Sequence, residues 1–91
     1  MERPASLPEH LAPIWDEMTG QVNQKIGAAG MEALCIQVFR MRDAQARVSR
    51  DGLMVSDEKG RATEHPALAV ERAASREVMA WLKQFPAPRR L

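Results

Sequence analysis

Two long segments with helical apolar spacing, joined by a polar stretch that contains two glycines, make up residues 31–85. The first segment, residues 31–50, contains neither proline nor glycine and is rich in good helix formers. The second begins at His65-Pro66, where a proline suits the first turn of a helix, and continues until two further prolines stop it. We therefore predict an antiparallel helical hairpin over residues 31–85, to which the rest of the chain is attached.

The first of these segments carries two apolar stripes on different sides. One stripe consists of Met31, Leu34, Cys35, Val38 and Met41, and the other of Ile36, Phe39 and Ala46. A single partner helix cannot cover both stripes, so this helix should have two neighbours. We expect one neighbour to be the second arm of the hairpin and the other to be an adjacent protomer. The residues predicted to serve helix packing or assembly are Ile36, Phe39, Val78 and Trp81.

The chain of 91 residues is predicted to form one all-α domain over residues 1–91. Such a domain has a thin core, for which oligomerisation is a usual remedy. The predicted parts are a helical segment at 7–26 with Pro13 in its first turn, a bend at Gly27–Gly30, the hairpin at 31–85 and a basic tail at 86–91. For the link between the two arms, a small β-hairpin and a plain ordered loop remain equally open.

The charge is unevenly distributed, although the net charge is only +1. Residues 1–20 carry a net charge of −3, whereas residues 40–50 carry +3. One protomer should bind nucleic acid weakly, but repeating the basic patch around an assembly would sum its field. The alternative is a solvated surface of salt bridges, with Asp43 spaced to pair with a neighbouring arginine. The candidates for DNA contact are Arg40, Arg42, Arg47, Arg50, Arg89 and Arg90.

No catalytic constellation is visible, and we predict no catalytic residue, metal site or cofactor. His10 and His65 lie in different elements, without further metal ligands at the required spacing. We expect His65 either to serve the start of the second long helix or to face solvent. Cys35 lies within an apolar stripe and should be a small buried hydrophobe. The start of the chain lacks a signal peptide and no apolar run could span a membrane, which predicts a cytoplasmic protein.

A set of residues in a characteristic order runs through most of residues 7–91: Leu7-Pro8, His10-Leu11 and Trp15, then Leu34-Cys35, Arg40, Arg42, Ala44, Ala46, Gly52-Leu53, Gly60, His65-Pro66-Ala67-Leu68, Glu71, Ala73-Ala74 and Arg89-Arg90-Leu91. In this order of residues the chain resembles the small terminase subunits of tailed phages. The resemblance implies a non-enzymatic packaging protein that forms a ring-shaped homo-oligomer. It also implies engagement of double-stranded viral DNA and recruitment or regulation of the large terminase subunit, an ATPase and nuclease.

The chain departs from many small terminases, because residues 1–6 leave no room for a preceding helix-turn-helix domain. This favours a short form that binds DNA weakly and without sequence preference, similar to gene-transfer-agent or prophage packaging proteins. A second hypothesis is a small helical adaptor that binds only protein, with the hairpin docked in a partner's groove.

Overall fold

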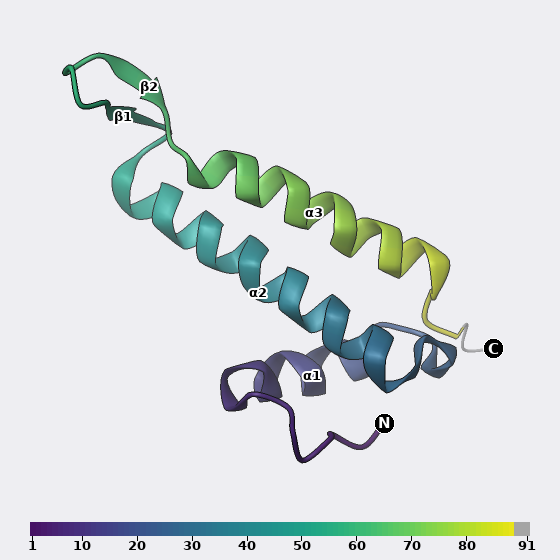
Figure 1. The fold of residues 1–91 in the computed structure, drawn as a ribbon. Helices are drawn as coiled ribbons and strands as arrows, with labels where there is room; N and C mark the ends of the chain where they lie inside the picture. The colour runs from purple at the N-terminus through teal and green to yellow at the C-terminus, as the bar shows by residue number, and fades with distance from the viewer. Residues whose placement is uncertain (89–91) are drawn as a thin grey trace.

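The computed structural model describes residues 1–88, in which two long helices lie side by side as an antiparallel hairpin (Figure 1). These helices are α2 (Gly27–Asp51) and α3 (Ala67–Gln84). The described chain is elongated, with extents of 54 × 30 × 18 Å. The predicted hairpin is therefore confirmed. The all-α prediction is only partly right, because a small two-stranded sheet lies at the tip of the hairpin.

The start of α2 differs from the predicted bend at Gly27–Gly30. Gly27 has φ of +73°, a conformation that favours glycine, and it directly follows a 3-10 turn, η2 (Gln24–Ile26). Gly30, in contrast, lies inside the helix, where the Trp81 ring approaches its backbone. The bend is thus confined to the first of the two glycines, and α2 starts four residues earlier than predicted.

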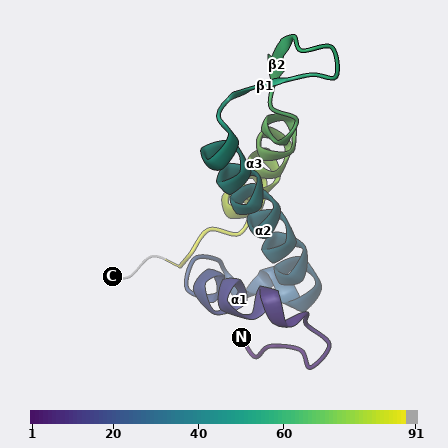
Figure 2. The same ribbon diagram turned by 90° about the vertical axis from the view of Figure 1, so that its left-hand side faces the viewer.

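The N-terminal segment crosses the first half of α2 at the end of the molecule opposite the tip (Figure 2). It consists of a 3-10 turn, η1 (Glu9–Leu11), and α1 (Ala12–Thr19), which has Pro13 in its first turn as predicted and ends at Gly20. Trp15 is fully buried, and its indole N–H donates to the backbone oxygen of Met1 at 3.2 Å. The first residues are therefore attached to the core.

The core lies where α1, α2 and α3 meet. Its buried members are Leu11, Ile14, Trp15, Met18, Val22, Ile26, Met31, Leu34, Cys35, Val38 and Val78. The first predicted stripe of α2 supplies four of these residues, and Met41 of the same stripe packs against them while partly buried. Cys35 is buried as predicted. The first stripe thus belongs to the core of the single chain.

The link between the long helices forms the β-hairpin that the sequence had left open. Strand β1 (Met54–Ser56) pairs antiparallel with β2 (Ala62–Glu64), and Val55 lies opposite Thr63. Asp57 shapes the turn, because its Oδ1 accepts from the backbone N–H groups of Lys59 and Arg61 at 2.9 and 2.8 Å. The hairpin projects beyond the ends of α2 and α3 (Figure 1).

The chain after α3 returns to the segment that follows α1. The Asn23 N–H donates to the Phe85 carbonyl at 3.0 Å, and Val22 forms an isolated antiparallel bridge with Pro86. The start of the predicted tail at 86–91 is therefore paired with the N-terminal part of the chain, while residues 89–91 lie outside the described residues. Across residues 1–88, we find no helix with the length and apolar character that membrane crossing requires.

Candidate nucleic-acid interface

Four of the arginines predicted to contact DNA lie on α2, in or near its second half. All four are exposed, and Arg40 and Arg47 share a face because they are seven residues apart. Arg50 lies in the last turn, where its charge complements the negative end of the helix dipole. Gly52 then ends α2, with φ of +89° and its N–H donated to the Val48 carbonyl at 2.7 Å.

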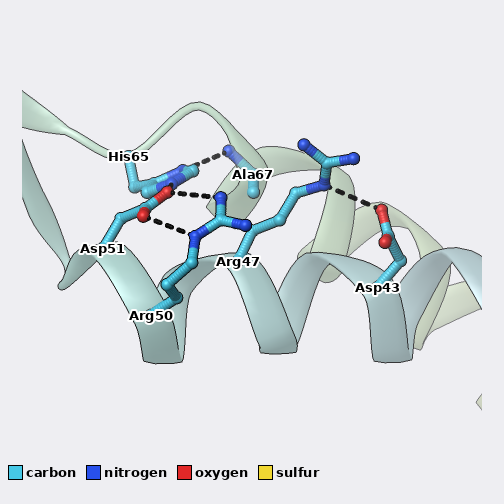
Figure 3. Close-up of polar contacts among 6 residues, drawn as sticks. All are labelled: Asp43, Arg47, Arg50, Asp51, His65 and Ala67. Carbon is cyan, nitrogen blue, oxygen red and sulfur yellow. Dashed lines mark hydrogen bonds and ion pairs between the residues drawn. The ribbon is translucent and has the colours of Figure 1, made fainter.

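Arg47 and Arg50 are each paired with a carboxylate of α2 (Figure 3). Arg47 Nε donates to Asp43 Oδ2 at 2.9 Å, which confirms the pairing predicted from their spacing. Arg50 binds Asp51 through two hydrogen bonds of 2.8 and 3.0 Å. Both arginine side chains are more than half exposed. Such exposed pairs contribute little stability, so a phosphate can compete for these guanidinium groups.

Arg42 is held differently, in a bidentate ion pair with Glu17 of α1. Its two terminal nitrogens donate to the two carboxylate oxygens at 2.8 and 2.6 Å. The hydrogen bond from Arg42 lowers the pKa of Glu17, and the same bond raises the pKa of Arg42. This pair joins α1 to α2. A role for Arg42 in DNA binding would require breaking a contact that supports the fold.

Arg40 is exposed and has no ion pair within residues 1–88. Of the four arginines on α2, it therefore has the guanidinium most available to a phosphate. Arg89 and Arg90, the other two candidates, lie outside the described residues. On the second long helix, Arg72 pairs with Glu64 of β2 at 2.8 Å, and not with an acid of its own helix.

A cluster that the sequence did not predict lies where α2 ends and α3 begins. Here Asp51 accepts from Arg50 and lies 2.9 Å from His65 Nε2, while His65 Nδ1 lies 3.0 Å from the Ala67 backbone nitrogen. Hydrogen bonds from Arg50 and then from His65 lower the pKa of Asp51. His65 thus serves the start of the second long helix, which was one of the two expectations for it. The His65-Pro66 dipeptide before an apolar run was the available signal.

The four residues predicted to serve packing or assembly take different positions. Val78 is buried in the core, and Trp81 packs against the core and stacks on Phe85 with ring centroids 5.9 Å apart. Ile36 is half-buried against the same core. Phe39 remains 39% exposed and contacts His10 edge-on, with ring centroids 4.8 Å apart. Part of the second stripe on α2 is thus in contact with the chain's own N-terminal segment.

A family model described as phage terminase, small subunit, matches residues 12–86. The chain belongs to this family. The match includes α1, both long helices and the tip hairpin, and so covers the surfaces described above. Comparisons with curated proteins and with solved structures found no match. As a member of the terminase small-subunit family, the chain has a role in DNA packaging.

Proposed function

We propose that this terminase small subunit is a non-catalytic packaging protein that binds double-stranded DNA weakly and without sequence preference. The family match carries the packaging role, and the exposed arginines of α2 support a DNA-binding surface. In this proposal Arg40 is the principal phosphate contact. Arg47 and Arg50 exchange their carboxylate partners for phosphates, whereas Arg42 keeps its bond to Glu17. Arg89 and Arg90, which lie outside the described residues, remain further candidates for DNA contact.

Assembly into a ring-shaped homo-oligomer is part of the same proposal. A single chain offers few cations, and repetition around a ring would sum their attraction for DNA. The exposed part of Phe39 and the half-buried Ile36, both on α2, are the proposed contacts with the next protomer. The assembled ring would then recruit or regulate the large terminase subunit. Light scattering after size exclusion should show one species several times the mass of the monomer.

The DNA-binding surface can be tested with two matched variants, Arg40→Gln and Arg76→Gln. Both remove one exposed arginine that has no ion pair within residues 1–88, the first from α2 and the second from α3. Since each phosphate contact contributes about 0.9 to the slope of log K against log salt, Arg40→Gln should reduce that slope by about 0.9 for each protomer that contacts the DNA. Arg76→Gln should leave it unchanged. An equal decrease of the slope in both variants would show that DNA binding depends on net charge and not on the position of Arg40.

A protein-binding adaptor is the second candidate function. It is favoured by the ion pairs of three α2 arginines and by Leu53 and Met54, large apolar residues that are exposed at the tip. The adaptor hypothesis predicts no DNA binding even at low salt, together with retained binding to the large subunit. A gel-shift titration at low salt and a pull-down with the large subunit distinguish the two functions.

A further inference from the structure

His65 lies at the junction of three elements, and its side chain is only 11% exposed. Its backbone N–H donates to the Leu53 carbonyl at 2.8 Å, just before β1. Its ring lies between the two long helices, with Nε2 2.9 Å from Asp51 Oδ2 and Nδ1 3.0 Å from the Ala67 nitrogen (Figure 3). The ring therefore connects the C-terminus of α2 to the N-terminus of α3.

The partners of the ring determine where its proton lies. The Ala67 backbone N–H can only donate, so His65 Nδ1 must accept. An ionised carboxylate can only accept, so Nε2 must carry the proton that is donated to Asp51. The Asp51 carboxyl stays ionised because hydrogen bonds from Arg50 and His65 hold its pKa well below the usual range. The geometry thus requires a neutral imidazole with its proton on Nε2.

We propose that His65 is a protonation-dependent cap of α3, which releases the first turn of this helix when the ring gains its second proton. That proton must go to Nδ1, which then can no longer accept the Ala67 N–H. The bond to Asp51 remains and becomes an ion pair. Protonation would therefore keep the ring on α2 while freeing the start of α3. This inference is independent of the proposed DNA-binding function.

The start of α3 depends on this acceptor because of its local sequence. Pro66 has no N–H, and the Leu68 N–H donates to the His65 carbonyl oxygen at 3.0 Å. Among the backbone N–H groups at the start of α3, the Ala67 N–H is the one whose acceptor is the His65 ring. Once the ring is protonated, this N–H must donate its hydrogen bond to water. Histidine is the residue whose ordinary titration range, about pH 5 to 8, makes such a change accessible.

The charged groups around the ring act in opposite directions. From α2, the Asp51 carboxylate favours the imidazolium, while Arg50 on the same carboxylate weakens that effect. From β2, Glu64 precedes His65 and is paired with Arg72 of α3. Arg47 is paired with Asp43, one turn closer to the start of α2. The positive end of the α3 dipole disfavours the imidazolium. The loss of the Nδ1 acceptor on protonation follows from the geometry of the ring and does not depend on these groups.

Nuclear magnetic resonance of the full chain between about pH 8 and pH 5, the titration range of histidine, tests the proposal. At alkaline pH, the 15N shifts of the His65 ring should identify the tautomer with the proton on Nε2. As the ring titrates, the hydrogen-exchange protection factor of the Ala67 amide should fall about five- to tenfold, as expected for a lost helix cap. The Ala74 amide is an internal control, because it lies in the interior of α3, beyond the first turn.

Two variants sharpen the test. His65→Asn offers an uncharged acceptor to the Ala67 N–H, so protection should no longer depend on pH in this range. Asp51→Asn keeps the ring and replaces the ionised acceptor at Nε2 with an amide, so the loss of the Ala67 hydrogen bond on protonation should persist. The proposal is overturned by a proton on Nδ1 at alkaline pH, or by an Ala67 amide that is unprotected at pH 8 or unchanged through the titration. The same pH dependence in His65→Asn would also overturn it.

Discussion

Gly30 of α2 lies directly against the indole ring of Trp81 of α3. A Cβ atom added to Gly30 would lie 3.3 Å from Trp81 Cζ3 and 2.8 Å from Ile26 Cγ1. The distance of 2.8 Å to Ile26 is shorter than the contacts that Cβ atoms make in real structures. The glycine therefore allows the indole to approach the α2 backbone, at the end of the hairpin where α1 packs.

Replacing Gly30 with alanine should destabilise the protein. Alanine gains about 0.5 to 1 kcal/mol over glycine inside a helix. Overpacking a filled site costs about 1 to 3 kcal/mol, which outweighs this gain, and both Ile26 and the ring would have to move. We expect Gly30→Ala to lower the free energy of unfolding by about 1 kcal/mol. Urea unfolding followed by the tryptophan fluorescence measures this change.

Gly20 provides the matched control for this substitution. A Cβ on Gly20 meets nothing within 4 Å, and its φ of −83° suits any residue. Gly20→Ala should be neutral or stabilising by up to about 1 kcal/mol, because alanine reduces the entropy of the unfolded chain. If Gly30→Ala were as stable as Gly20→Ala, the close contact with Trp81 would not be the reason that residue 30 has no side chain.

The sequence was sufficient to predict the hairpin because its helix signals are local. Apolar spacing marks both long helices, Gly52 ends the first and Pro66 precedes the second. The Asp43–Arg47 pair follows from the same four-residue spacing. These features depend on residues that are close in sequence, and for this reason they were predicted correctly.

Contacts between distant segments could not be predicted in the same way. Glu17 and Arg42 are 25 residues apart, and nothing in either local pattern indicates their bidentate pair. The role of Gly30 likewise depends on Trp81, which lies on the other arm of the hairpin. The four arginines of α2 are exposed, as the sequence suggested, whereas the distinction between Arg42 and Arg40 required the structure.

Stability should decrease in acid through two carboxylates, Glu17 and Asp51. The hydrogen bond from Arg42 lowers the pKa of Glu17, and those from Arg50 and His65 lower that of Asp51. Between the lowered folded-state pKa and the ordinary value of about 4, the unfolded chain binds more protons than the folded chain. Their stabilisation is thus present above that ordinary value and is lost as the pH falls through the folded-state pKa.

Urea unfolding at a series of pH values from neutral to strongly acidic measures this dependence. Glu17→Gln and Asp51→Asn should each be less stable than the wild type near neutral pH. The difference from the wild type should shrink as the pH falls, because the wild-type carboxylates then become protonated. A constant difference at every pH would contradict the assignment of the stabilisation to ionised carboxylates.

The Cys35 thiol should be unreactive in the folded protein. Burial raises its pKa to about 11, with a smaller contribution from the Glu32 carboxylate. The thiolate is the reacting species, so both its low population and its lack of exposure slow alkylation. Iodoacetamide at mildly alkaline pH should label Cys35 slowly in the folded chain and rapidly in denaturant. A Cys35→Ala/Ala46→Cys variant, with its thiol at an exposed position of α2, should react rapidly in both states.

The tip hairpin should unfold locally when Asp57 loses its side-chain oxygens. Its Oδ1 accepts two backbone N–H groups, and isolated two-stranded hairpins are only marginally stable. Asp57→Ala should therefore abolish the cross-strand contacts between Val55 and Thr63, which nuclear Overhauser effects detect. The midpoint of thermal unfolding should change little, because the tip projects away from the core formed by the helices. Asp57→Asn retains an acceptor and should preserve the hairpin, so loss of the contacts in both variants would assign the effect to charge.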